Sequence, residues 1–214
     1  NDPVRLLLKK QTADGHGSGN TRLEGAEYTV KYYDILSDTD PAQSGSTAKY
    51  TWVFKTDENG RIRLTPDYLI EGSDELVSDA NGVYVLPLGT ITLRETKAPE
   101  GYLINDTVYV AQTSLTNNYI VTTNLPTDDK AAQETPYEGT ISIQKFLGGS
   151  NAVKTSEPDA EFKIYLKSAG SYDASPEDSR QTITTDANGY AITKRLPYGT
   201  YTIHQTKGNN KYYF

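Results

Sequence analysis

The sequence predicts an all-β protein built from two tandem copies of one β-sandwich unit, the second copy being incomplete at its C-terminus. Three observations lead to this prediction. Apolar and polar residues alternate in short segments that end at turn residues. Tyrosine is abundant, at 17 of 214 residues, and aromatic side chains favour strands. Finally, a pattern in the first 124 residues returns after residue 138, as in repeat architectures.

The first copy begins with an alternating segment in which Leu6, Leu8 and Lys10 share one face. Turns of the form Asp-x-Asn-Gly at 57–60 and 79–82 separate later segments. No window has a helical period over three turns, although residues 65–76 have room for a short helix. The further strands are expected at 26–33, 49–55, 61–64, 83–86, 90–96, 107–112 and 119–124.

A polar segment with two prolines, residues 125–138, follows these strands. Such composition is typical of a linker, and a long surface loop inside one domain is the alternative. The predicted organisation is therefore a first domain at 1–126, a linker at 127–138 and a second domain at 139–214.

The repeat itself is visible as matched segments. The pairs are 6–10 with 141–145, 25–30 with 159–164, 78–84 with 185–190, and 86–97 with 196–207. Aligned in this way, the first copy carries an insertion at about 57–77. The second copy stops at residue 214, before the hairpin that would complete it.

Composition excludes several classes of site and partner. The chain has no cysteine and no methionine, so it has neither disulfides nor thiol nucleophiles, and we interpret it as a piece of a longer chain. Two histidines leave little for metal binding, and we expect neither a metal nor another cofactor. A net charge of −7 disfavours nucleic acid and anionic membranes as partners. No apolar stretch approaches the ~20 residues that span a bilayer.

Several of these motifs resemble tandem Cna protein B-type domains, the prealbumin-like β-sandwiches of Gram-positive pilins and surface adhesins. The motifs are the first strand ending in lysine, the segment 23–28, the turn 79–82, the Leu-Pro-x-Gly-Thr turn, and the segment 93–102, which is close to the E-box of that family. The resemblance implies a bond within the chain. In that family, a first-strand lysine condenses with an Asn or Asp of the last strand, and the E-box acid promotes formation of the isopeptide bond.

Carried over to this chain, the resemblance implies an isopeptide bond between Lys10 and Asn124, promoted by Glu95. Strand parity agrees, since each of the three lies on the apolar face of its segment. Asn117 and Asn118 are alternatives to Asn124, although they are more typical of a hairpin turn.

The chemistry required of such a site is consistent with burial. A lysine nucleophile must be neutral, and a neutral carboxylic acid can donate a hydrogen bond and shuttle a proton. Burial favours the neutral form of both groups. Folding supplies the proximity, so the reaction is a single turnover on the protein itself and not enzymatic catalysis.

The second copy departs from this pattern. Lys145 matches the reactive lysine, but Gln205 stands where the acid is expected, and glutamine does not shuttle protons as a carboxylic acid does. We therefore expect no crosslink there. A buried lysine needs a partner, and Glu161 is a candidate.

The leading functional hypothesis is a structural or adhesive segment of a surface pilin or adhesin stalk. Such a segment is extracellular, is attached to the cell wall through its parent chain, and has neighbouring modules as partners. The alternative is an adhesin module that binds a host matrix protein or glycan through the 57–77 insertion or tyrosine-rich faces. An enzyme, such as a glycosidase, is disfavoured because no pair of acids lies in an evident cleft-forming context.

Overall fold

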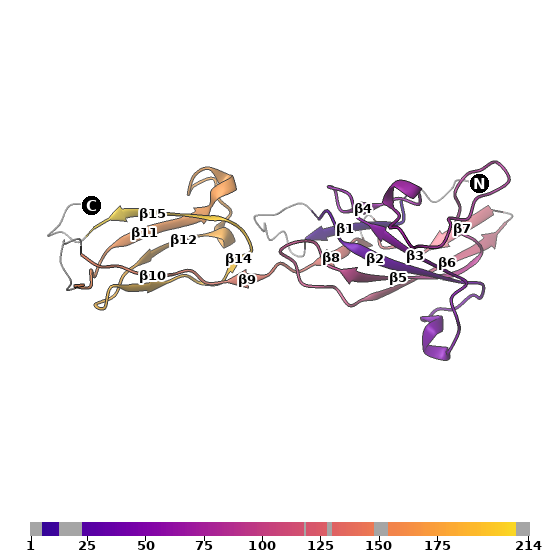
Figure 1. Ribbon diagram of the computed structural model, residues 1–214, viewed down its shortest axis with the longest axis horizontal. Coiled ribbons are helices and arrows are strands. Elements are labelled where there is room, and N and C mark those ends of the chain that lie inside the picture. The colour runs from indigo at the N-terminus through magenta and orange to yellow at the C-terminus, as the bar shows by residue number, and fades with distance from the viewer. Residues whose placement is uncertain (1–5, 13–22, 118, 128–129, 148–153, 209–214) are drawn as a thin grey trace. The chain divides into compact units, whose positions relative to one another are not determined.

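The computed structural model describes residues 6–12, 23–117, 119–127, 130–147 and 154–208 (Figure 1). The chain divides into two compact units. Unit 1 contains the described residues up to Thr135, and unit 2 contains those from Pro136 onward. The described ranges contain strands and short 3-10 turns but no α-helix, which confirms the all-β prediction. Where a short helix had room at 65–76, only the 3-10 turn Pro66–Tyr68 forms.

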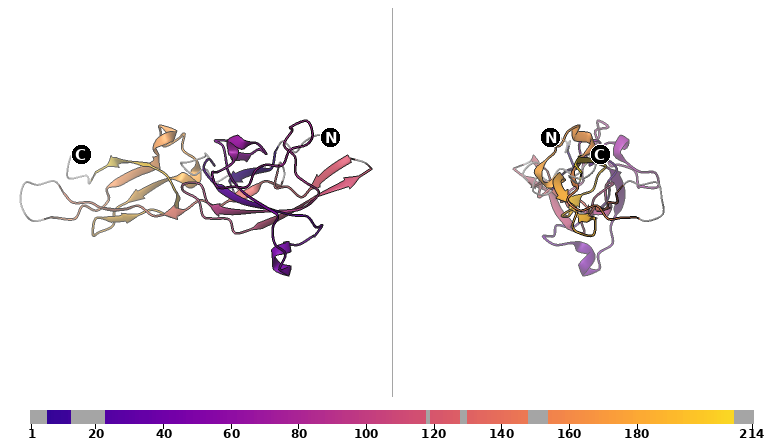
Figure 2. Two further views of the ribbon diagram at one scale, coloured as in Figure 1. Left: turned by 45° about the vertical axis from the view of Figure 1, so that its right-hand side comes forward. Right: turned by 90° about the vertical axis from the view of Figure 1, so that its left-hand side faces the viewer.

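Unit 1 is built around an antiparallel five-stranded sheet with the order β3-β2-β5-β6-β7. Its strands are β2 (Glu27–Tyr33), β3 (Tyr50–Lys55), β5 (Gly89–Lys97), β6 (Val108–Thr116) and β7 (Tyr119–Thr123). The hairpin of β6 and β7, drawn in pink, forms one edge of this sheet (Figure 2).

A second sheet in unit 1 has the order β4-β1-β8. Strand β1 (Leu8–Thr12) pairs antiparallel with β4 (Arg61–Ile62) and parallel with β8 (Ala132–Glu134). Strand β8 lies within the segment that the sequence suggested as a linker, so the strand that closes unit 1 comes after 119–124. Its three residues are too few for an alternating pattern to reveal.

The core of unit 1 lies between these sheets and follows the predicted alternation. Successive inward positions of β2 are Tyr28, Val30 and Tyr32, all buried. Leu93 of β5 is fully buried in the same cluster, and Trp52 of β3 is nearly so. Many tyrosines are therefore packing residues, each contributing a large buried apolar area.

Unit 2 repeats the arrangement with fewer described strands. One sheet has the order β12-β11-β15, from β11 (Glu161–Leu166), β12 (Arg180–Thr184) and β15 (Tyr201–Lys207). Two antiparallel pairs accompany it, β10 (Ser142–Gln144) with β13 (Tyr190–Ile192) and β9 (Glu138–Gly139) with β14 (Leu196–Pro197).

Backbone hydrogen bonds correct the alignment of the two copies. The Lys10 amide donates to Gly60 O at 2.8 Å, and the Lys145 amide donates to Gly189 O at the same distance. The Thr56 hydroxyl accepts a hydrogen bond from the Ala26 amide and donates one to Leu23 O. The Thr185 hydroxyl does the same with the Ala160 amide and Glu157 O. The turn 186–189 therefore corresponds to 57–60, not to 79–82. The extra residues of unit 1 consequently lie between Ile62 and Leu86, and the predicted insertion at 57–77 was placed too early.

No helix in the described ranges is long and apolar enough to cross a membrane.

Candidate functional site: a buried lysine between two carboxylates

Lys10 lies at the centre of a buried cluster of charged side chains in unit 1. Its side chain and those of Glu95 and Glu134 are fully buried. Lys10 Nζ donates a hydrogen bond to Glu95 Oε1 and lies 2.8 Å from Glu134 Oε1. Parallel pairing of β1 with β8 sets Lys10 opposite Ala132, so Glu134, two residues further on, lies on the same face of the sheet.

Glu134 is held in conditions that favour its neutral form. Burial raises the pKa of this carboxyl from its ordinary 4.5 to about 7, and the nearby charge of Glu95 adds to the rise while Lys10 opposes it. The contact with Lys10 has the distance of an ion pair, but neither Glu134 oxygen has a hydrogen-bond donor of good geometry among the described residues. An unsatisfied buried carboxylate is costly, which is the physical reason for the raised pKa.

Glu95 is oriented by the loop that follows its strand. Its Oε2 accepts a hydrogen bond from the backbone N–H of Asn105 at 2.6 Å. The Asn105 side chain donates to Gln133 O at 2.9 Å, inside β8. One loop residue therefore fixes the Glu95 carboxyl and also holds the strand that carries Glu134.

Tyr28 forms the aromatic wall of the cluster. Lys10 Nζ lies 5.1 Å from the centre of its ring, within the range of a cation–π contact. Burial, followed by the charges of Glu95 and Glu134, raises the pKa of the Tyr28 hydroxyl. Its ring keeps water from the lysine, and the phenol remains protonated.

The structure places Lys10 in contact with Glu95 but does not place Asn124 with them. Asn124 follows the edge strand β7, is exposed, and has a left-handed backbone with φ of 62°. Asn117 occupies the hairpin turn with φ of 51°, and Asn118 lies outside the described residues. Parity predicted that Asn124 points into the interior, but Asn124 lies beyond the end of β7, where the backbone leaves the extended conformation, and β7 pairs with β6 and not with β1.

The residues that sequence reasoning missed are Glu134 and Asn105. For Glu134, the sequence offered one signal. Glu134 follows the apolar Ala132 by two positions, just as Lys10 follows Leu8. This signal is weak because the prolines nearby suggested a linker.

Unit 2 has no equivalent cluster in the part of the chain that the structure describes. Lys145 Nζ lies 3.6 Å from Glu157 Oε2, and Glu157 occupies the position that Leu23 has in unit 1. The candidate partner Glu161 instead accepts a hydrogen bond from Thr206 Oγ1 at 2.6 Å. Gln205 donates to Lys207 O and makes no hydrogen bond to Lys145.

The arrangement in unit 1 contains the groups that acyl transfer requires. The Lys10 amine contacts one oxygen of each carboxyl, so one carboxyl can act as the acyl group while the other moves a proton. Burial excludes water that would compete with the amine.

Comparison with models of protein families identifies the family to which the chain is related. A family described as SpaA, prealbumin-like fold domain, matches residues 9–128 and 149–214. The chain belongs to this SpaA prealbumin-like family. The match covers both units, so the predicted resemblance to prealbumin-like surface domains is confirmed. No curated protein matches the chain.

Solved structures similar to this SpaA-family chain include three of known origin. The Bacillus anthracis TIE protein is 22% identical, with a TM-score of 0.46, and the match covers 94% of this chain and 28% of that one. A streptococcal ancillary pilin is 22% identical, with a TM-score of 0.35 and coverages of 97% and 54%. A C-terminal fragment of the pilus adhesin SpaC from Lactobacillus rhamnosus GG is 16% identical, with a TM-score of 0.42 and coverages of 98% and 77%. This chain therefore spans about a quarter of the length of the TIE protein and about half the length of the ancillary pilin.

Proposed function

We propose that the chain is a structural segment of a Gram-positive surface protein, a pilin or adhesin stalk, whose first unit is closed by an amide bond between Lys10 and Glu134. The observation that carries the crosslink is the Lys10 Nζ to Glu134 Oε1 distance of 2.8 Å in a fully buried site where the same amine also contacts Glu95. Membership of the SpaA prealbumin-like family and the tandem β units support the structural role.

The reaction begins with a proton transfer inside the cluster. Lys10 becomes a neutral amine and Glu134 a neutral carboxylic acid, the form that its raised pKa favours. Lys10 Nζ attacks Glu134 Cδ. Glu95 takes a proton from the nitrogen and returns it to the departing hydroxyl, so a C–N bond forms, a C–O bond breaks and one water leaves. Nothing is oxidised or reduced.

This proposal replaces the acyl partner expected from the sequence. An asparagine donor releases ammonia, whereas a glutamate donor releases water. The two assignments therefore differ in the mass of the product as well as in the residues linked.

Intact-mass spectrometry of the full chain tests the crosslink. We expect a mass one water below that of the sequence, and proteolysis should give a branched peptide joining β1 to β8. Lys10→Met, Glu134→Met and Glu95→Gln should each restore the full mass. Lys9→Met, on the opposite face of β1, and Asn124→Ala should both keep the deficit.

Two results would contradict this assignment. An unshifted mass means that the cluster remains an ion pair. A deficit of one ammonia that persists in Glu134→Met and disappears in Asn124→Ala assigns the bond to Asn124. The structural role is tested separately, because the parent protein should be found in the cell-wall fraction of its host whether or not the bond forms.

A further inference from the structure

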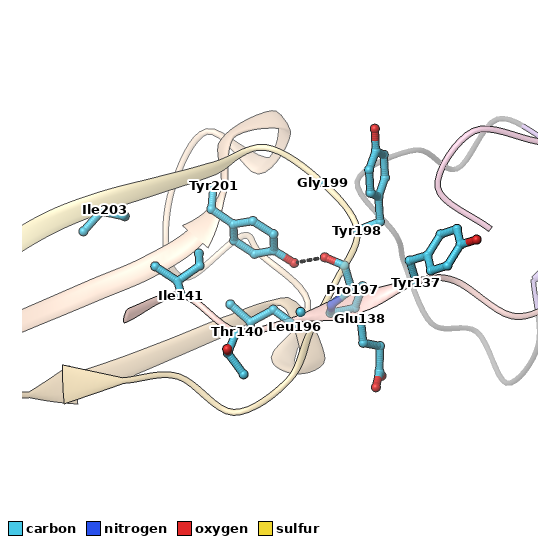
Figure 3. A pocket seen from close by; sticks show the side chains of 11 residues that line it. Tyr137, Glu138, Thr140, Ile141, Leu196, Pro197, Tyr198, Gly199, Tyr201 and Ile203 are labelled. Atoms are coloured by element: carbon cyan, nitrogen blue, oxygen red, sulfur yellow. Dashed lines mark hydrogen bonds between the residues drawn. The ribbon is translucent and has the colours of Figure 1, made fainter. Parts of the chain in front are cut away.

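The proposed function leaves two features of the molecule unused. One is a pocket of about 440 Å³ in unit 2, around which Figure 3 shows apolar side chains such as Ile141 and Ile203. It lies beside β15, the last strand that the structure describes, and nothing in the structure shows what covers it. The other is the chemically labile dipeptide Asn-Gly, which occurs three times, at 59–60, 81–82 and 188–189.

An Asn-Gly peptide is labile because the backbone nitrogen of the glycine can attack the asparagine side chain. Glycine has no Cβ to hinder the approach. The nitrogen loses its proton and bonds to Cγ of the asparagine, the Cγ–Nδ2 bond breaks and ammonia leaves, so a cyclic succinimide forms. Water then opens the ring at either of its carbonyls. The products are aspartate and isoaspartate, in which the main chain runs through the side-chain carbon.

All three dipeptides lie in turns with the same local hydrogen bonds. In each turn, the glycine amide donates to the carbonyl of the aspartate that begins the turn, at 2.9 to 3.0 Å. The carboxylate of the same aspartate accepts a hydrogen bond from the asparagine amide at 2.8 to 2.9 Å. All three asparagines are exposed. Any difference in reactivity must therefore come from what holds the glycine on its other sides.

Gly60 and Gly189 are each held by a second set of contacts. Gly60 O accepts a hydrogen bond from the Lys10 amide, and Gly189 O accepts one from the Lys145 amide. Both glycines are buried. A Cβ on Gly60 would lie 2.9 Å from Leu23 Cβ, and a Cβ on Gly189 would lie 2.4 Å from Lys145 O. Forming the ring requires the glycine peptide to rotate, which at these two positions breaks a strand contact in a closely packed space.

Gly82 lacks this restraint. It is exposed, and a Cβ there would meet nothing within 4 Å. Among the described residues, no backbone amide donates to Gly82 O. The flanking residues Ser78 and Tyr84 form an isolated bridge, whereas strands flank the other two turns. Few contacts oppose local opening of this turn, so its free energy of opening should be low.

We propose that Asn81 is a site of spontaneous modification, at which the side chain converts to aspartate and isoaspartate through a succinimide with Gly82. The fold protects Asn59 and Asn188 from the same reaction. Conversion replaces a neutral amide by a carboxylate, so it adds a negative charge to an exposed turn. The open space around Gly82 also accommodates the extra main-chain carbon of isoaspartate. The reaction raises the mass of the chain, whereas the proposed crosslink lowers it, so the two are measured independently.

Peptide mapping of the full chain after incubation in mildly alkaline buffer tests the proposal. Asn81 should convert at least about tenfold faster than Asn59 and Asn188 in the folded protein. Asn188 is the matched control, because both residues lie in the sequence Asp-Ala-Asn-Gly. In denaturant, the two should convert at similar rates. Gly82→Ala should slow conversion of Asn81 because the added Cβ hinders the attack, and circular dichroism checks that this variant remains folded.

Three outcomes would overturn the proposal. Equal conversion of Asn81 and Asn188 in the folded chain would show that the contacts of Gly189 give no protection. An unmodified Asn81 after a time in which the denatured chain converts would show that the turn at 79–82 is itself protective. An unchanged rate in Gly82→Ala would exclude attack by the nitrogen of residue 82.

Discussion

Lys10 Nζ lies 2.8 Å from Glu134 Oε1, although the two residues stand near opposite ends of unit 1 in sequence. The parallel pairing of β1 with β8 creates this contact. The cluster contains two carboxylates and one amine in a fully buried site, an excess of one potential negative charge. This imbalance can be relieved by protonating Glu134 or by converting it to an amide, and each route has measurable consequences.

Replacing Glu95 by glutamine should block the crosslink and lower stability. The glutamine side chain keeps an oxygen that can accept the hydrogen bond from the backbone N–H of Asn105. It does not shuttle a proton as a carboxylic acid does. Loss of a bond that closes a loop of roughly 124 residues should reduce the free energy of unfolding by about 4–5 kcal/mol on the loop-entropy account. Chemical denaturation of the unmodified chain and of Glu95→Gln, alongside their intact masses, measures the effect. Equal stability of a crosslinked and an uncrosslinked form would contradict it.

Removing the lysine alone should be worse than removing it together with one acid. Lys10→Met leaves Glu95 and Glu134 buried with no cation between them, which typically costs about 3–5 kcal/mol. Lys10→Met/Glu134→Met replaces the pair by apolar groups and should recover a large part of that loss. Neither variant can form the bond, so the comparison isolates the charges. Urea denaturation compares them, and additive effects would argue against a coupled cluster.

The uncrosslinked protein should become more stable as the pH falls from about 7 to 4.5. Burial raises the pKa of Glu134 from 4.5 to about 7, so the folded state binds this proton more tightly than the unfolded state does. The contribution is fully present below pH 4.5 and is lost as the pH rises through 7, and it amounts to roughly 3 kcal/mol. Glu95→Gln supplies uncrosslinked protein for the titration. Adding Glu134→Gln should flatten the difference, and an unchanged profile would refute the raised pKa.

Two glycines that end similar turns should respond differently to alanine. Gly60 and Gly82 both have positive φ, at 68° and 76°. A Cβ on Gly60 would lie 2.9 Å from Leu23 Cβ and 3.3 Å from Lys10 Cβ, whereas a Cβ on Gly82 meets nothing within 4 Å. Gly82→Ala should therefore cost about 1 kcal/mol for the backbone alone. Gly60→Ala should cost more and should slow crosslinking, as thermal denaturation and time-resolved mass measurements would show.

Leu93 of β5 and Ile203 of β15 occupy the same position in the two sequence copies and should differ in the cost of truncation. Leu93→Ala in the closed core should cost about 2–5 kcal/mol. Ile203→Ala should cost well under half as much, because its side chain is half exposed. Hydrogen exchange resolved to each unit measures the two losses separately. A large loss at Ile203 would mean that the residue is covered in solution.

The sequence was sufficient for the elements that depend on local pattern. The Tyr, Thr and Val residues at 26–33 predicted β2, and the parity of Lys10 and Glu95 predicted that both point inward. The position of β8 was not predictable in this way. Three residues give no period, and their pairing with β1 depends on contacts between distant parts of the chain. The acyl partner was consequently assigned to Asn124, the last residue of a strand that could be recognised.

The alignment of the repeats failed for a similar reason. Unit 1 contains two Asp-x-Asn-Gly turns, and the one at 79–82 matches the sequence of the turn at 186–189 more closely. Hydrogen bonds from Lys10 and Lys145 to Gly60 and Gly189 show that the less similar turn is the structural equivalent. Turn chemistry recurs wherever a tight reversal is needed, so a shared turn motif is a poor guide to register.

The parallel arrangement of β1 and β8 also determines how unit 1 responds to tension. A pull on the chain enters unit 1 through its first strand and leaves through its last, and these two strands lie side by side. Because they are parallel, such a pull slides one past the other and loads their hydrogen bonds together instead of opening them one by one. A covalent link from Lys10 to Glu134 would carry the force across that single point. The strands between them would then bear none of it and would stay folded under loads that extend an ordinary domain.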